Sequence, residues 1–228
     1  MNPSVAYFHQ HGITLSRAEL AIVHKQQFLD QLLTSQLHIP TDMQPVLLRR
    51  RCEFVAGRWC AMQAMKQLGL NKIHQPNIGK YNEPIWPNNV VGSISHTNDT
   101  AVAIAMRPNK HAGAIGVDRE NIMEPQLAGK FAKKIMSLEE LTFNSYFSGH
   151  ALFVTTIFSS KEALFKAMFA QIERVVDFSV AQVSHIDNKA QIIELTLTQT
   201  LSQRLVAGRK INVLYTLNKA WVETYTVI

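Results

Sequence analysis

Residues 114–120 read AIGVDRE, a short apolar segment that leads directly into two carboxylates separated by one arginine. This pattern predicts a strand that ends at Asp118. Side chains alternate across a strand, so Asp118 and Glu120 should share one face while Arg119 points to the other. Two carboxylates on one face suit Mg²⁺, which binds one or two carboxylates together with water and phosphate oxygens. Because D-x-E is a common spacing, an ordinary polar strand end is the alternative interpretation.

Residues 151–169 read ALFVTTIFSSKEALFKAMF and predict the most apolar helix of the chain. Its apolar stripe contains Lys161, which is unusual unless the lysine snorkels or pairs with a carboxylate. Glu162 and Lys166 lie four apart on the adjacent face. They are either a third carboxylate and a phosphate-binding cation or a surface ion pair. Ser159 and Glu162 also fit the capping box of a shorter helix, although we favour the continuous one.

Three carboxylates and a lysine are a suitable set of groups for metal-assisted phosphoryl transfer. The metal neutralises charge, a base accepts a hydroxyl proton, and the lysine stabilises the leaving side. A Mg²⁺-dependent nuclease would use the same groups, so residue chemistry alone leaves both enzyme classes open. The formal net charge of +6 adds a third alternative, a basic nucleic-acid-binding protein without chemistry. Against it, the arginines cluster at one helix instead of alternating with aromatic residues along a stripe.

The rest of the chain predicts an α+β fold with a boundary near residues 107–113. The composition turns β-rich from Phe178 onward, which predicts a closing antiparallel meander. Gly69 follows a helical pattern and is expected to form its C-cap. The other expected elements are helices over 15–33, 46–68 and 124–146, a loop over 71–89, and a hairpin of 90–96 and 101–106.

The composition is that of a foldable globular protein, with 46% hydrophobic and 18% charged residues in a chain of 228. The apolar run Ala101–Met106 is too short to cross a bilayer, and residues 1–12 lack the features of a secretory signal. Cys52 and Cys60 lie about 12 Å apart if both are on one helix, too far for a disulfide. These features predict a cytoplasmic protein without disulfides.

Five segments together resemble one known family. GVDRE (116–120) resembles the G-[IV]-D-x-E motif of the Sfp-type 4′-phosphopantetheinyl transferases, and SSKEALFKA (159–167) resembles their [WF]-[ST]-x-K-E-[AS]-x-x-K-A motif. RRRCEFVAGR (49–58), IGKYNEPIWP (78–87) and GSISHT (92–97) follow the family's order and spacing. The pattern is most similar to that of the siderophore-associated branch, which includes the enterobactin synthase component.

The resemblance implies two similar α/β halves related by a pseudo-twofold axis, here residues 1–110 and 111–228, with coenzyme A (CoA) between them. It implies Mg²⁺-dependent transfer of phosphopantetheine from CoA, the co-substrate, to a carrier-protein serine, with release of 3′,5′-ADP. The implied partners are apo carrier domains of nonribosomal peptide and polyketide synthases in siderophore pathways. Nucleic acid is not an expected partner, and a monomer without a transmembrane segment is expected.

The resemblance also implies a role for each matching residue. Asp118, Glu120 and Glu162 match the Mg²⁺ ligands, and Glu162 or a metal-bound water would accept the serine proton. Lys166 matches the lysine that contacts the CoA pyrophosphate and assists departure of 3′,5′-ADP. The other residues expected at CoA are the phosphate-contacting Arg50, Arg58 and His96, the adenine-side Lys80 and Pro84, and Ser95, Asp118 and Lys161.

Two positions depart from the family pattern. The loop that usually reads G-K-P has Asn82 and Glu83 before Pro84, so an acidic side chain replaces a basic one and Lys80 would have to compensate. Arg119 stands where an aliphatic residue is more usual, and a bulge there would disrupt the metal site. Two simpler interpretations also remain at this stage. Residues 49–51 could be a solvated helix end, and His96 could be a turn residue.

Overall fold

The structure is a computed structural model that describes residues 4–10, 13–70 and 73–228. It divides into two compact units, Met1–Gly113 and Ala114–Ile228. Each unit combines one antiparallel sheet with helices, in agreement with the predicted α+β class.

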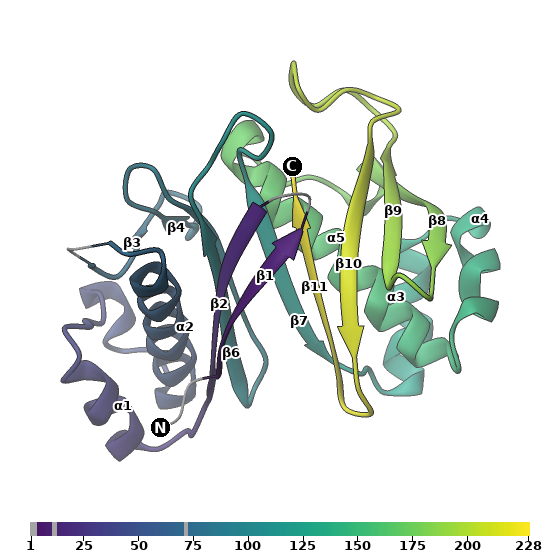
Figure 1. The fold of residues 1–228 in the computed structure, drawn as a ribbon. Coiled ribbons are helices and arrows are strands. Elements are labelled where there is room, and N and C mark those ends of the chain that lie inside the picture. The colour runs from purple at the N-terminus through teal and green to yellow at the C-terminus, as the bar shows by residue number, and fades with distance from the viewer. Residues whose placement is uncertain (1–3, 11–12, 71–72) are drawn as a thin grey trace. The chain divides into compact units, whose positions relative to one another are not determined.

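The first unit contains a four-stranded antiparallel sheet in the order β1-β2-β6-β5 (Figure 1). Helix α2 packs on β6, β2 and β5, and α1 packs on α2. The elements are β1 (Ser4–Gln10), β2 (Ile13–Ala21), α1 (Gln26–Leu33), the 3₁₀ turn η1 (Thr41–Met43), α2 (Leu48–Gln67), β3 (Asn77–Ile78), β4 (Pro84–Ile85), β5 (Val91–His96) and β6 (Thr100–Met106).

Small residues on α2 allow the helix to lie close to the sheet. A Cβ at Gly57 would lie only 2.9 Å from the Ile94 side chain. Because glycine has no side chain, α2 can approach β5 closely at this position. Cys52 and Cys60 are both free, as predicted, and both are buried in this core. Gly69 has a φ of 72° just after α2, which confirms its place at the C-terminal end of the helix.

The helix predicted over residues 15–33 is only partly correct. Residues up to Ala21 form β2, and the helix begins at Gln26. β2 lies between β1 and β6, so its backbone groups are paired on both sides. The sequence LSRAEL has good helix propensity, but a central place in the sheet overrides that preference. Val23, in the segment between β2 and α1, is 44% exposed.

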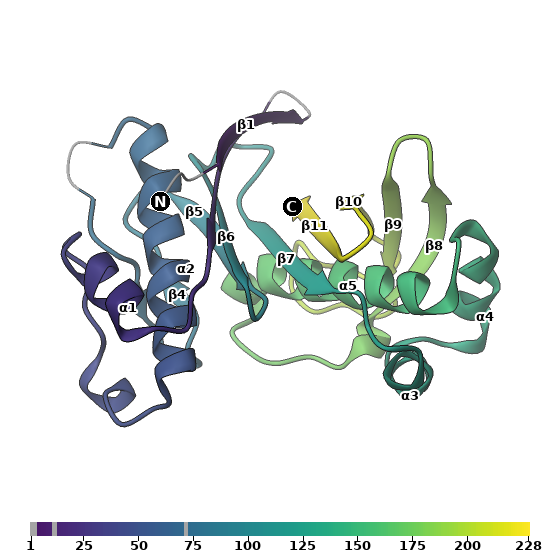
Figure 2. The same cartoon turned by 90° about the horizontal axis from the view of Figure 1, so that it is seen from below.

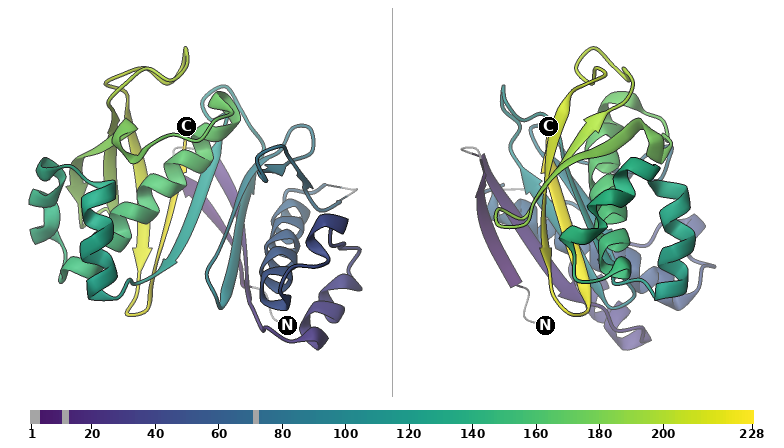
Figure 3. Two further views of the ribbon diagram at one scale, coloured as in Figure 1. Left: turned by 180° about the vertical axis from the view of Figure 1, so that it is seen from behind. Right: turned by 90° about the vertical axis from the view of Figure 1, so that its right-hand side faces the viewer.

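The second unit contains a five-stranded antiparallel sheet in the order β7-β11-β10-β9-β8. Helix α5 packs against β7, β11 and β10, and α3 packs against α5 (Figures 2 and 3). The elements are β7 (Ile115–Asn121), α3 (Pro125–Ile135), α4 (Leu138–Leu141), η2 (Thr142–Tyr146), α5 (His150–Ile172), η3 (Phe178–Val180), β8 (Ala181–Asp187), β9 (Ile192–Leu197), β10 (Lys210–Leu217) and β11 (Trp221–Val227).

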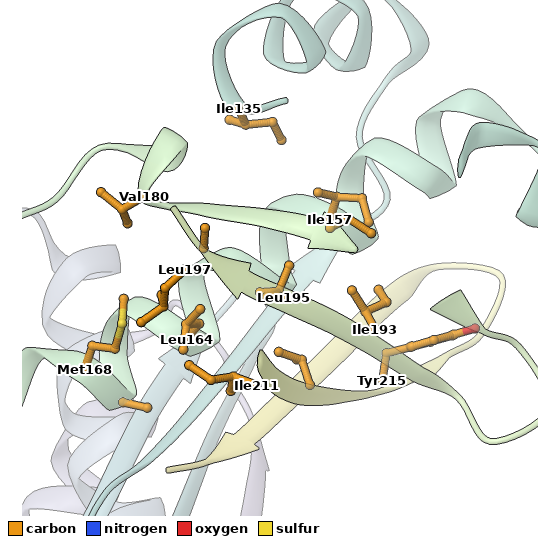
Figure 4. Packing of buried hydrophobic residues seen from close by; sticks show 14 of the residues in the cluster. Ile135, Ile157, Leu164, Met168, Val180, Ile193, Leu195, Leu197, Ile211 and Tyr215 are labelled. Carbon is orange, nitrogen blue, oxygen red and sulfur yellow. The ribbon is translucent and has the colours of Figure 1, made fainter. Parts of the chain in front are cut away.

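The core of the second unit lies between α5 and the sheet. Figure 4 shows Ile157 and Leu164 of α5 among side chains of β9 and β10, including Leu195. These three side chains are fully buried. Burial of each such side chain contributes about 1.5–3 kcal/mol, so this layer fixes the helix on the sheet.

Several predicted elements of the second unit are confirmed. The apolar helix is continuous from His150 to Ile172, which excludes a helix start at Ser159, and the meander after Phe178 is present. The helix predicted over 124–146 is instead interrupted. Ser137 and Glu140 form a capping box that starts the short helix α4 after α3 has ended at Ile135.

Predictions for the first unit have a similar outcome. The hairpin of 90–96 and 101–106 is confirmed as β5 and β6. The loop over 71–89 contains the short β3–β4 hairpin, while residues 71–72 lie outside the described residues. Part of the N-terminal segment 1–12 also lies outside them. In the ranges that the structure describes, we find no helix with the length and apolar character needed to cross a membrane.

The close approach of β7 to α5 at Gly116 leads to a prediction. A Cβ at this position would lie 1.9 Å from the Ala163 carbonyl oxygen, an atom of the helix backbone that cannot swing aside. Gly116→Ala should therefore lower the free energy of unfolding by at least about 1–3 kcal/mol, measured by urea denaturation.

Gly129→Ala is the matched control for this substitution. A Cβ at Gly129, inside α3, meets no heavy atom within 4 Å. The same added methyl should raise the free energy of unfolding by about 0.5–1 kcal/mol because alanine is the better helix former. Equal midpoints for the two variants would contradict the tight contact at Gly116.

Candidate active site

Strand β7 presents Asp118 and Glu120 on the face that carries α5. The pairing with β11 runs without a register shift from Ile115 to Asn121, so no bulge disturbs the alternation. Arg119 is on the opposite face, where its Nη1 donates to Glu223 Oε2 at 3.1 Å. Its guanidinium also lies 3.9 Å from the Trp221 ring centroid. The prediction that Arg119 points away from the two carboxylates is confirmed.

Lys166 connects α5 to the part of β7 that carries the two carboxylates. Its Nζ donates to Asp118 Oδ1 at 2.7 Å and to the Val117 carbonyl oxygen at 3.1 Å. The Lys166 side chain is 30% exposed, whereas that of Asp118 is 4% exposed. The ion pair thus has a buried carboxylate on one side and a solvent-accessible ammonium on the other.

Glu162 lies one helical turn before Lys166, and its charge acts on the carboxylates of β7, a strand that continues to Asn121, beyond the end predicted at Asp118. Burial raises the pKa of Glu120 to about 7, with Asp118 adding to the shift, Lys166 opposing it and Glu162 adding again. Burial also raises the pKa of Glu162, and the charge of Asp118 adds to that effect against Lys166. The three carboxylates therefore repel one another, and a single lysine offsets their charge only in part.

These carboxylates do not form a preorganised metal-binding site. Within the described ranges, no three His, Cys, Asp or Glu side chains are arranged as a metal-binding cluster. The donor set nevertheless fits Mg²⁺ chemically, because it consists of carboxylate oxygens whose mutual repulsion a divalent cation would relieve.

A second group of predicted residues lies in the first unit. Arg50 of α2 and His96 at the end of β5 are brought together, with 2.6 Å between Arg50 Nη1 and His96 Nε2. Arg49 also contacts Asn98 in the turn after β5. Residues 49–51 are therefore more than a solvated helix end, and His96 does more than form a turn.

Arg58 is on the same helix as Arg50 but in a different environment. It is 5% exposed, and its guanidinium lies 4.9 Å from the centroid of the Phe54 ring. Burial lowers its pKa to about 10. In the part of the chain that the structure describes, Arg58 Nε has no hydrogen-bond partner. Among the described residues, Arg58 does not join the hydrogen bonds of Arg50 and His96, so its expected place beside them stays a prediction.

The two unusual residues of the 79–84 loop have a structural role. Asn82 has a φ of 66°, a left-handed conformation that asparagine tolerates well. The Glu83 carboxylate accepts a hydrogen bond from the Tyr81 backbone N–H at 2.8 Å and so closes the turn. Lys80 lies over the Tyr81 ring, and Pro84 starts β4. The departure from G-K-P is thus explained by the turn that this loop forms.

Two further residues expected at CoA are buried. Lys161 is 0% exposed, and its Nζ lies 2.8 Å from Glu140 Oε1 and 2.6 Å from the Ile135 carbonyl oxygen. Burial lowers the pKa of Lys161, and the charge of Glu140 opposes this shift. The structure therefore corrects the expectation for Lys161, whose ammonium is enclosed in the core and paired there. Ser95, 6% exposed within β5, is also largely covered.

Sequence reasoning missed Glu53, which lies among the arginines of α2. Its carboxylate accepts hydrogen bonds from Arg49 Nε at 2.9 Å and from Arg50 Nη1 at 3.3 Å. The signal was present in the sequence, because Glu53 follows Arg49 by four residues and Arg50 by three, the two spacings that bring side chains together on a helix.

Comparison with known proteins identifies the class. Residues 42–106 match the family model described as the 4′-phosphopantetheinyl transferase N-terminal domain, and residues 114–216 match that of the 4′-phosphopantetheinyl transferase superfamily. The chain is also 32% identical over 109 residues to a holo-[acyl-carrier-protein] synthase of Lactococcus lactis, covering 42% of this chain and 90% of the relative. The chain therefore belongs to the 4′-phosphopantetheinyl transferase superfamily, as its motifs predicted.

Other relatives are enterobactin synthase component D proteins. The Salmonella typhi protein is 32% identical over 140 residues, covering 61% of this chain and 56% of the relative. The Escherichia coli K12 protein is 33% identical over 147 residues, covering 64% and 66%. The chain thus spans between half and two thirds of the length of these relatives.

One of the similar solved structures illustrates the match. It is a holo-(acyl-carrier-protein) synthase from Bacillus anthracis in complex with CoA (3′,5′-ADP), which is 20% identical to this chain. The match covers 50% of this chain and 93% of that one, with a TM-score of 0.39. The family assignment rests on the sequence matches.

The buried pair of Lys161 and Glu140 leads to a stability prediction. Glu140 also accepts hydrogen bonds from the Ser137 and Val183 backbone N–H groups, so its carboxylate cannot move to solvent without losing them. Lys161→Met should therefore lower the free energy of unfolding by about 3–5 kcal/mol, measured by urea denaturation, because it leaves a buried carboxylate without its ammonium.

Lys210→Met is the control for this prediction. Lys210 pairs with Glu194 at 2.9 Å, but its side chain is 63% exposed, so its loss should cost at most about 1 kcal/mol. The double variant Lys161→Met, Glu140→Gln should regain part of the loss by removing the unpaired charge. An effect of Lys161→Met as small as that of Lys210→Met would show that the buried pair does not stabilise the fold.

Proposed function

We propose that this protein transfers the 4′-phosphopantetheine arm of CoA to a serine of an apo carrier protein and releases 3′,5′-ADP. The observation that carries the proposal is the pairing of Lys166 with Asp118 beside Glu120 and Glu162. It supplies a partly exposed cation next to clustered carboxylates, the groups that transfer of a phosphoryl-linked arm requires. Membership of the superfamily supports the same reaction.

In the proposed mechanism, Glu162 accepts the proton of the carrier serine. Its pKa is raised, which brings the carboxylate nearer to the range in which a general base works best at neutral pH. The serine oxygen then forms a bond to the β-phosphorus of CoA, and the bond from that phosphorus to the oxygen of 3′,5′-ADP breaks. Lys166 stabilises the charge that develops on the departing pyrophosphate oxygen.

Asp118, Glu120 and Glu162 would hold Mg²⁺ in this proposal, and the cation would neutralise charge on the phosphate oxygens. Mg²⁺ typically uses only one or two protein carboxylates and completes its shell with water and substrate phosphates. Lys166 orients the Asp118 carboxylate on β7 by its 2.7 Å contact. Arg50 and His96 would contact the 3′-phosphate of CoA.

The proposed partners are apo carrier domains of nonribosomal peptide or polyketide synthases, in siderophore biosynthesis as in the relatives named enterobactin synthase component D. We further propose that the protein acts as a cytoplasmic monomer. Its remaining predicted CoA contacts, among them Arg58, Lys80 and Pro84, belong to the same proposal.

The reaction class can be tested by intact mass spectrometry of an apo aryl or peptidyl carrier protein incubated with this protein, CoA and MgCl₂. We expect the carrier mass to rise by one phosphopantetheine, and the gain to disappear with EDTA and return with excess Mg²⁺. A carrier whose serine is replaced by alanine is the control. Unmodified carriers together with no measurable CoA binding would exclude the proposal, and a nuclease assay would then test the alternative enzyme class.

The role of Glu162 gives a separate prediction. Glu162→Gln should lower kcat about 10²- to 10⁴-fold, the usual effect of losing a general base, without changing the thermal unfolding midpoint by more than a few degrees. Glu173→Gln removes the same charge from the exposed C-cap of the same helix and should leave turnover unchanged. Turnover near the wild-type rate in Glu162→Gln would remove Glu162 from the mechanism.

A further inference from the structure

Glu53 is a buried acidic residue in a basic neighbourhood of the first unit. Its side chain is 8% exposed, whereas those of Arg49 and Arg50 are 56% and 53% exposed. Glu53 Oε1 accepts from Arg49 Nε at 2.9 Å, and Glu53 Oε2 accepts from Arg50 Nη1 at 3.3 Å. One carboxylate on the inner side thus engages two arginines whose outer parts are open to solvent.

Two histidines complete the surroundings of this carboxylate. His96 Nδ1 lies 3.9 Å from Glu53 Oε2, and His24 Nε2 lies 4.0 Å from Glu53 Oε1. Burial would raise the pKa of Glu53, but the hydrogen bonds from Arg49 and Arg50 and the charges of His96 and Arg49 outweigh it and hold the pKa below its usual value. Glu53 is therefore a carboxylate anion that faces basic groups from α2, from β5 and from the segment before α1.

We propose that Glu53 is a positioning residue that holds Arg50 and His96 in the arrangement that recognises the 3′-phosphate of the CoA nucleotide. The inference rests on the proposed function, in which Arg50 and His96 contact that phosphate. Glu53 itself does not touch the ligand, because a carboxylate next to a phosphate would repel it.

The hydrogen-bond roles around His96 support this positioning role. Arginine can only donate, so the 2.6 Å contact between Arg50 Nη1 and His96 Nε2 is a hydrogen bond in the form of His96 whose ring is neutral and carries its proton on Nδ1. That Nδ1 is the nitrogen that lies 3.9 Å from Glu53 Oε2. The carboxylate thereby favours one ring orientation and one tautomer, and Nε2 remains on the side of Arg50.

The remaining donors of Arg50 are suited to an anion. A guanidinium has five N–H donors, and among the described residues Arg50 contacts Glu53 and His96 through Nη1 alone. Two arginines and one carboxylate leave a net positive charge at the cluster. Fixing a long, half-exposed arginine before the ligand arrives lowers the entropy that binding would otherwise cost.

A competing interpretation makes Glu53 a substitute anion that masks the arginines until phosphate displaces it. The two interpretations predict opposite effects for Glu53→Gln. If Glu53 masks the site, its neutralisation frees two arginines and adds positive potential, so a nucleotide with a 3′-phosphate binds more tightly. If Glu53 positions the site, the same nucleotide binds more weakly despite the added positive charge.

Isothermal titration calorimetry of the full chain with 3′,5′-ADP and with 5′-AMP separates these outcomes, because 5′-AMP lacks the 3′-phosphate. For Glu53→Gln we expect the Kd of 3′,5′-ADP to rise about tenfold or more, as for loss of a charge-assisted hydrogen bond, and the Kd of 5′-AMP to change less than about twofold. In the transfer assay, KM for CoA should rise while kcat stays near the wild-type value.

Glu194→Gln is the matched control, because Glu194 is also ion-paired and its substitution changes the net charge by the same amount. It should leave both nucleotide affinities unchanged. Unchanged 5′-AMP binding in Glu53→Gln would show that the variant is folded. Tighter binding of 3′,5′-ADP, or equal weakening of both nucleotides, would overturn the positioning role.

The same measurements separate this inference from the proposed function. If the wild-type protein modifies a carrier but Glu53→Gln keeps the full preference for 3′,5′-ADP over 5′-AMP, the inference fails and the proposed function stands. If no carrier is modified and yet Glu53→Gln loses that preference, the proposed function fails and the role of Glu53 stands. A wild-type protein without any preference for 3′,5′-ADP would overturn the inference directly.

Discussion

The close contact between β7 and α5 governs the second unit. Gly116 lets the strand approach the helix backbone more closely than any side chain would permit. Two residues further along the strand, the same approach brings Asp118 within 2.7 Å of Lys166 Nζ. The packing of β7 on α5 and the geometry of the ion pair therefore depend on the same close contact, because a wider spacing between strand and helix would separate Asp118 from Lys166. The buried layer around Leu164 fixes the spacing independently of the charged groups.

Helix α5 carries two lysines, Lys161 and Lys166, that lie five residues apart in different environments. Lys161 is enclosed and satisfied by Glu140 and a backbone carbonyl, which makes it part of the core. Lys166 has a buried carboxylate partner but a partly exposed side chain. A helix advances by about 100° per residue, so five residues rotate a side chain by roughly 140°. The motif that contains both residues thus combines a lysine of the core with one whose side chain is partly exposed.

Sequence patterns predicted the parts of this fold that depend on local periodicity. Helix α5, the hairpin of β5 and β6, the closing meander and the orientation of Arg119 all follow from the spacing of side chains along a helix or strand. β2 was missed because LSRAEL is compatible with a helix, and only its neighbours β1 and β6 make it a strand. The sequence predicted which residues could belong to the site, but it did not predict that Lys161 is buried. Its buried ammonium pairs with Glu140, twenty-one positions earlier, and no local pattern connects the two residues.

The arginine cluster of α2 shows why counting charges describes such a site poorly. By formal charge, residues 49–51 are simply a basic segment of a basic chain. In the structure, Glu53 lies beneath two of those arginines, and His96 arrives from a strand more than forty residues later. If Glu53 orients these donors as proposed, an acidic residue strengthens anion recognition because it is buried on the inner side while the donors remain exposed on the outer side. Whether an acidic residue helps or opposes phosphate binding depends on its distance from the phosphate and on the donors that it orients.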